Sequence, residues 1–348
     1  MFKAVVLFLA VLTASASSAG TAYPPTIQAL IAHQWVPAHD LDLMDKFYLE
    51  VAGMLEAEKF AELEGLAKEL RASKILFTNG DQASHHLYMA LAEMPNDKDE
   101  PAWQRREALI KKWMDQGHSG ESLMARASFD VNASIRFKGR DRRAAEVATT
   151  RDRVRANDHL NWGRQAAADA GRRLKEDPDV YYWMAETLYD PDRFQFQKLA
   201  EKSHAADPAF PYTDAVTTVS MAMTSGSINR HGGGEWLDKV MARPDGLGAE
   251  AYARSCVELA RRTSATYFFK TLSVEYGKVA TGFGMMSKRF PNSQSNYSRW
   301  IFFLCARRDW PTAQKYVQFM KGKFDRRFWL SEKRYTEIIS QKEDIDGH

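Results

Sequence analysis

The sequence contains few of the residues and motifs that most directly reveal a function. It has only two cysteines, Cys256 and Cys305, too few for the disulfide framework of a small secreted domain. Its charges nearly balance, with 48 Lys and Arg against 45 Asp and Glu, and it has no long basic run typical of nucleic-acid binding. A Gly-x-Ser-x-Gly elbow and a P-loop are also missing. We therefore expect no nucleic-acid partner and find no catalytic motif.

Spacings typical of metal sites are missing as well. The nine histidines include no His-Glu-x-x-His motif, and the cysteines form no Cys-x-x-Cys pair. His85 and His86 are adjacent, so on a helix they point about 100° apart and are poorly placed to share an ion. We predict neither a metal site nor a cofactor.

Long hydrophobic runs and β-strand patterns do not occur beyond the N-terminus. A membrane-spanning helix needs about 20 apolar residues, so no transmembrane segment is expected after signal removal. No segment alternates apolar and polar residues with β-branched enrichment, which excludes a doubly wound nucleotide-binding sheet.

The first residues have the pattern of a secretory signal peptide. Lys3 supplies the positive charge, residues 4–14 are apolar apart from one threonine, and small residues follow. We expect residues 1–19 to be the signal peptide, with cleavage between residues 16 and 22. The mature protein is then exported, either to the periplasm or out of the cell. The alternative is a buried N-terminal helix.

From residue 41 onward the apolar residues follow a helical pattern. Leu41, Met44 and Phe47 begin a three-four spacing, and after a break at residues 56–58 a second stripe begins at Phe60. Two amphipathic helices with a short connection indicate an antiparallel hairpin. The sequence predicts further helices at 81–93, 100–116, 121–139, 146–175, 179–189, 192–206, 211–225, 233–242, 247–262, 266–290, 294–308, 310–322 and 326–341.

Two segments are similar to tetratricopeptide repeats. In the first, Tyr182 and Trp183 start a helix, and a second helix rich in small residues ends before Asp207-Pro208. The second segment begins at Trp300. We expect an all-α, tetratricopeptide-like α-solenoid of stacked helical hairpins. Its expected divisions are an N-terminal extension over 20–40, a helical repeat domain over 41–341 with a bend near 226–234, and a polar tail over 342–348.

Several motifs also occur in a particular order along the chain. They are the stretch from Leu55 to Arg71, Trp113, Asp177-Pro178, Tyr181 to Met184, Asp207-Pro208 before Tyr212, Gly232 to Trp236, and Leu304 to Asp309. In this order they resemble a bacterial helical family known as domain of unknown function 4034, over roughly residues 45–330. The resemblance implies a tetratricopeptide-like architecture and supplies no catalytic residues. The family often has Pro-Arg-Trp-Gly-Gly where this chain has Ile228 to Gly233, which puts a shared role for that turn in doubt.

The most unusual turn contains three consecutive glycines, Gly232 to Gly234. These glycines could present backbone N–H groups to an anion beside Arg230 and His231. The alternative is a structural connector in which the glycines permit positive φ and Trp236 anchors the next helix. The predicted binding residues are Arg230, His231, Trp236, Tyr181 and Tyr182.

Three basic clusters occur, at residues 136–143, 151–155 and 321–327. They are either solvated helix faces or parts of a groove that captures acidic peptide segments or anionic envelope polymers. Cys256 and Cys305 are either two separate buried thiols or a disulfide, which requires Cα atoms within about 7 Å.

The functional hypothesis follows from the predicted architecture. A solenoid leaves a long concave face that suits proteins or extended peptides. We expect an exported interaction module that binds a protein or peptide on this face without catalysis. The alternative is a cell-envelope hydrolase with an unrecognised carboxylate or cysteine site.

Overall fold

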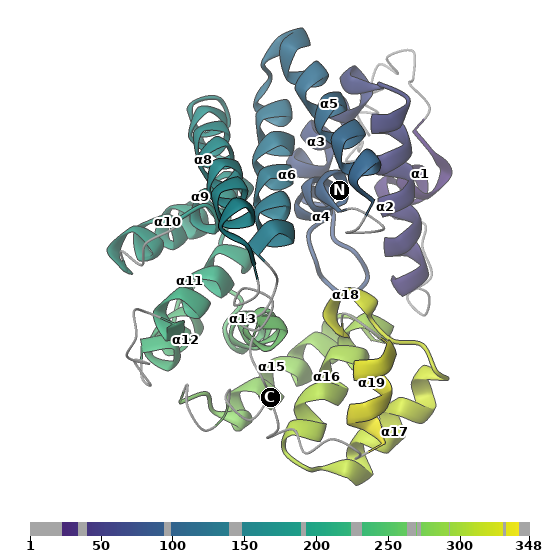
Figure 1. Cartoon of the computed structure of the whole chain (residues 1–348). Coiled ribbons are helices and arrows are strands. Elements are labelled where there is room, and N and C mark those ends of the chain that lie inside the picture. Colours follow the sequence, from purple (N-terminus) through teal and green to yellow (C-terminus); the bar gives the residue numbers. More distant parts are fainter. Residues whose placement is uncertain are drawn as a thin grey trace, which may run out of the picture.

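Helices make up most of the computed structural model, which describes residues 23–33, 40–93, 99–138, 148–188, 193–223, 232–262, 269, 273–291, 293–329 and 332–340 (Figure 1). In these ranges there is no strand, only an isolated bridge between Leu76 and Gln82. The helices are α1 (Pro25–Ile31), α2 (Asp40–Glu56), α3 (Phe60–Ala72), α4 (Ala83–Ala92), α5 (Glu100–Gly117), α6 (Gly120–Lys138), α8 (Thr150–Arg173), α9 (Pro178–Glu186), α10 (Arg193–Ala206), α11 (Tyr212–Met223), α12 (Gly232–Met241), α13 (Ala249–Arg262), α15 (Tyr276–Arg289), α16 (Gln294–Ala306), α17 (Trp310–Met320), α18 (Arg326–Trp329) and α19 (Glu332–Ile339).

The predicted all-α helical-repeat fold is confirmed, because neighbouring helices pack in pairs along the chain. Two details differ from the sequence-based prediction. The helix predicted over 266–290 is interrupted, since residues 273–275 are not helical, Ser273 has a φ of 53°, and α15 begins at Tyr276. In the expected N-terminal extension, α1 packs on α2, and the carboxylate of Glu50 accepts hydrogen bonds from its first backbone N–H groups. The bend predicted near 226–234 falls mostly outside the described residues.

Two hydrophobic clusters form most of the core. The larger one contains buried residues from Ile27 to Val216, and the second contains mainly residues from Val219 to Tyr335. Leu41, at the start of α2, belongs to the second cluster. The first helices therefore share a core with the last ones. No helix in the described ranges is both long and apolar enough to cross a membrane.

The chain closes on itself, so that α18 lies beside the helices of the N-terminal region (Figure 1). Lys323 binds Asp42 at 2.9 Å, and Arg327 binds Asp45 at 2.6 Å. Between these two ends, the loop before α4 reaches α13 and α16. Its residues and the polar groups around them form a largely buried group that we call the central polar cluster, made of Asp40, Asn79, Asp81, Arg254, Arg299 and Asp325.

Ion pairs and backbone hydrogen bonds hold the central polar cluster together. Asp81 accepts from Arg254 at 2.7 Å and from Arg299 at 2.9 Å. Arg299 also donates to Asp325, and Arg254 donates to the backbone carbonyl of Asn79. Burial alone would raise the pKa of Asp81, but the charges of Arg299 and Arg254 hold it well below its usual range. The cluster therefore fastens the first hairpins to the last.

Candidate functional site

The candidate site lies where α5, α6 and α8 meet. A capping box between Thr149 and Asp152 starts α8, and α8 then packs extensively on α6. Small residues allow this close approach: a Cβ on Gly163 would lie 3.1 Å from the Cβ of Asp130 and 3.4 Å from the carbonyl oxygen of Ala127. The short distance between the helices places His159 of α8 beside Asp130 of α6.

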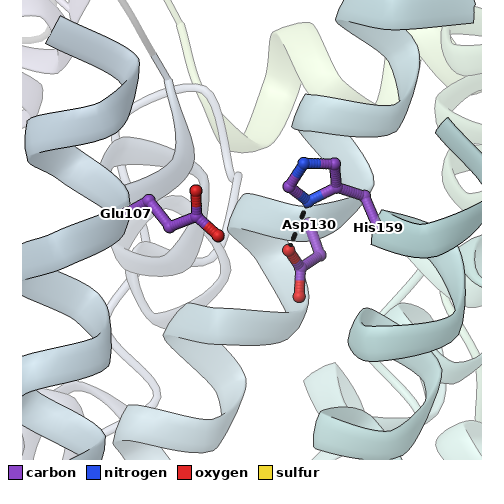
Figure 2. Close-up of side chains that lie close together, drawn as sticks. All are labelled: Glu107, Asp130 and His159. Carbon is purple, nitrogen blue, oxygen red and sulfur yellow. Dashed lines mark hydrogen bonds and ion pairs between the residues drawn. The ribbon is translucent and has the colours of Figure 1, made fainter. Parts of the chain in front are cut away.

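A network of four charged or titratable side chains forms the inner part of the site. His159 Nδ1 lies 2.8 Å from Asp130 Oδ1, and Glu107 of α5 points toward this pair (Figure 2). Arg126 joins the two carboxylates: its Nε donates to Asp130 at 2.7 Å and its Nη2 donates to Glu107 at 3.1 Å. The Asp130 side chain is fully buried, whereas that of Glu107 is 37% exposed.

This group could in principle hold a metal ion, since the nearest ligand atoms of Glu107, Asp130 and His159 all lie within 4.8 Å of one another. Nitrogen and oxygen ligands bind zinc at about 2.0–2.2 Å. An ion would therefore have to break the hydrogen bond between His159 and Asp130 and displace Arg126 from both carboxylates. The residues fit a neutralised ion-pair network better than a metal centre.

Arginines stacked on aromatic rings form the outer part of the site. Arg126 lies over Trp162, Arg136 over Trp103, and Arg155 over Phe137, with 5.6, 4.9 and 4.6 Å between guanidinium carbon and ring centroid. His159 links two of the rings, because it stacks on Phe137 and meets Trp162 edge-on. We call this the arginine–aromatic surface, made of Arg126, Arg136, Phe137, Arg155 and Trp162.

Part of the arginine–aromatic surface is open to solvent. Trp162 is 51% exposed, and the side chain of Arg155 is 43% exposed. Val154, on the same helix, is also largely exposed. Large exposed aromatic side chains flanked by arginine are enriched at protein interfaces. The surface therefore offers both apolar area and cationic groups to a partner.

Of the five binding residues predicted from the sequence, the three that the structure describes lie away from this site. Trp236 is buried on α12 beneath Lys239 and Arg243. Tyr182 is buried against His85. Tyr181 is half-buried, and its hydroxyl donates to the carbonyl of Lys175. Arg230 and His231 lie outside the described residues.

The two cysteines are buried free thiols in the second hydrophobic cluster. Burial raises the pKa of Cys256 well above its usual range and that of Cys305 to about 12. Thiols with raised pKa values are poor nucleophiles at neutral pH.

Sequence reasoning identified part of the site and missed the rest. The basic clusters at 136–143 and 151–155 supply Arg136 and Arg155, whose guanidinium groups both lie near Phe137. Asp130 and His159 were missed. The sequence did contain a signal that could have identified them, because each is a polar residue within a stripe of apolar and small residues on its helix.

Comparison with known proteins gave no relative: no family model, no curated protein and no solved structure matches this chain. The resemblance to domain of unknown function 4034 stays a prediction.

Proposed function

We propose that this chain is an exported interaction module, without catalysis, that binds an acidic peptide segment on the arginine–aromatic surface. The observation that carries the proposal is the half-exposed Trp162 beneath Arg126, next to the exposed Arg155. An aromatic ring gives contact area at low entropic cost, and arginine recognises carboxylates with several donors.

Charge complementarity favours an acidic partner. Asp130 is buried and already accepts from both Arg126 and His159, so it offers little to a ligand. Arg155 pairs only loosely with Glu100, with 3.8 Å between its Nη2 and Glu100 Oε1. Its donors suit an incoming carboxylate. Binding on the concave face and the periplasmic or secreted location stay predictions.

The hydrolase hypothesis has less support. A cysteine-based site would need a reactive thiolate, and burial raises the pKa of both thiols. The carboxylate version would need an acid or base that can reach a substrate, but Asp130 is fully buried, and the partly exposed Glu107 already accepts a hydrogen bond from Arg126.

Calorimetric titration tests the proposal. The probe is a peptide of glutamate and alanine with one tryptophan, and its matched control replaces every glutamate with glutamine. We expect the glutamate peptide to bind and the glutamine peptide to bind at least about tenfold more weakly, with the difference shrinking at high salt.

Three variants locate the binding. Trp162→Ala and Arg155→Gln should each weaken binding by about tenfold or less, as expected for interface anchors. Arg172→Gln is the matched control, because Arg172 is an exposed arginine on the same helix that pairs with Asp169 and lies away from the surface. Equal binding of both peptides, or equal effects of Arg155→Gln and Arg172→Gln, would contradict the proposal. So would linear polyphosphate binding as tightly as the peptide without dependence on Trp162.

A further inference from the structure

Two glutamates of α5 already bind the arginines of the arginine–aromatic surface. Glu107 accepts from Arg126 at 3.1 Å. Glu100 accepts from Arg136 at 2.6 Å and lies 3.8 Å from Arg155. Both glutamate side chains remain partly open to solvent, 41% for Glu100 and 37% for Glu107. The hydrogen bond from Arg136 is the main cause that lowers the pKa of Glu100, so this group is ionised at neutral pH.

The spacing of these glutamates defines a pattern. Glu100 and Glu107 are seven residues apart, which is nearly two helical turns and places them on one edge of α5 about 10 Å apart. Trp103 lies between them in the sequence, and its ring lies under Arg136. To the arginines, α5 therefore presents two carboxylates with an aromatic ring between them.

The two carboxylates that bind Arg126 differ in how easily an incoming carboxylate could replace them. Asp130 is fully buried and shares its charge between Arg126 and His159. Breaking such a buried pair is costly. The Arg126 side chain is only 12% exposed, but that of Glu107 is 37% exposed, so this pair lies at the edge of the surface and contributes less to stability than a fully buried one. An incoming carboxylate can therefore exchange with Glu107 while Asp130 keeps Arg126 in position.

We infer that the partner is an acidic helical segment whose two carboxylates have the spacing of Glu100 and Glu107. This inference rests on the proposed function. The partner's carboxylates compete with Glu100 and Glu107 for Arg126, Arg136 and Arg155, and its apolar side chain between them lies against Trp162. The two glutamates of α5 thus weaken the binding of any acidic partner, and they favour a partner whose carboxylates have the same spacing as their own.

The test uses two alanine-based helical peptides of equal charge. In the spaced peptide two glutamates are separated as Glu100 and Glu107 are, and in the adjacent peptide they are neighbours. Wild-type protein should bind the spaced peptide at least about threefold more tightly, which corresponds to one exposed ion pair.

Variants of α5 provide the second arm. The double variant Glu100→Gln with Glu107→Gln should bind the spaced peptide about threefold to tenfold more tightly than wild type. Asp169→Asn removes the same kind of charge from a carboxylate that pairs with Arg172 and not with the surface. This control measures how much the affinity for the peptide rises when any negative charge is removed from the protein. That rise should be smaller, per charge removed, than the rise in the double variant. Circular dichroism confirms that each variant keeps its helices.

The outcomes separate this inference from the proposed function. If both peptides bind equally, or if the double variant gains no more per charge than Asp169→Asn, the inference is wrong while the proposed function stands. If neither of these two peptides binds, and the glutamate peptide of the calorimetric titration does not bind either, the proposed function itself is wrong.

Discussion

The central polar cluster and the arginine–aromatic surface both contain arginines that pair with carboxylates, but the two regions differ in their surroundings. In the central polar cluster every carboxylate is buried, and Arg254 and Arg299 are tied to partners from distant parts of the chain. At the arginine–aromatic surface, Arg155 and Trp162 remain open to solvent. The first arrangement holds the fold together, whereas the second leaves groups that a partner can contact. Exposure, more than residue type, separates a structural ion-pair network from a candidate binding site.

If this comparison holds, the largest stability losses come from the central polar cluster. Arg299→Met leaves Asp81 and Asp325 without one of their cations, and removal of one partner from a buried pair costs about 3–5 kcal/mol. Chemical denaturation should show this loss. The matched control Lys323→Met breaks an exposed pair with Asp42 and should cost less than about 1 kcal/mol. Equal losses would contradict the structural role.

The loop before α4 offers a second test. Gly80 has a φ of 83°, and a Cβ there would overlap Arg254 and Phe290. We expect Gly80→Ala to lower the free energy of unfolding by about 1–3 kcal/mol or more. Gly53→Ala is the control. Gly53 lies inside α2, an added Cβ there would have no neighbour within 4 Å, and alanine favours a helix over glycine by about 1 kcal/mol. A neutral Gly80→Ala would show that the loop can leave α13.

The pH dependence of the central polar cluster gives a third test. Burial raises the pKa of Asp40 to about 6, although Ser293 and the backbone of Ser295 hydrogen-bond its charged form. The unfolded value is about 3.9. Between these two values the folded protein binds a proton that the unfolded chain does not, so Asp40 destabilises the fold as pH rises through this window.

The asparagine side chain in Asp40→Asn cannot ionise, so this variant lacks the loss of stability that ionisation of Asp40 causes in wild type. Compared with wild type, the variant should gain about 1–3 kcal/mol in relative stability when denaturation is measured near pH 7 instead of near pH 4. Although burial opposes it, the charge of Arg299 lowers the pKa of Asp81 and of Asp325, so both stay ionised in the folded protein across this window. A difference that does not change with pH would contradict a raised pKa at Asp40.

The smallest stability effects are expected at the arginine–aromatic surface. Arg155→Gln removes an exposed cation–π contact with Phe137 and should cost about 0.5–1 kcal/mol or less. Thermal unfolding of this variant and of Arg172→Gln should therefore be nearly the same. A large loss for Arg155→Gln would place this surface with the structural networks and remove the contrast between the two regions.

The sequence predicted the helices well because their apolar spacing is local. The apolar stripe that begins at Leu41 coincides with α2, and the breaker Asp177-Pro178 lies at the start of α9. Contacts between distant segments could not be predicted, since Asp81 and Arg299 are 218 residues apart and no periodic pattern connects them. Of the site, the basic clusters were visible in the sequence. The pairing of Asp130 with His159 depends on how closely α6 and α8 approach, and that is a property of the packed structure.

Hydrogen exchange with and without the glutamate peptide tests most directly whether the arginine–aromatic surface is the binding site. Bound peptide should slow exchange in the first half of α8, around residues 150–162, and near Arg136 on α6. Exchange around Asn79 and Arg254 in the central polar cluster should not change. Slower exchange at the central polar cluster or at Trp236, with none at α8, would contradict the assignment of the binding site.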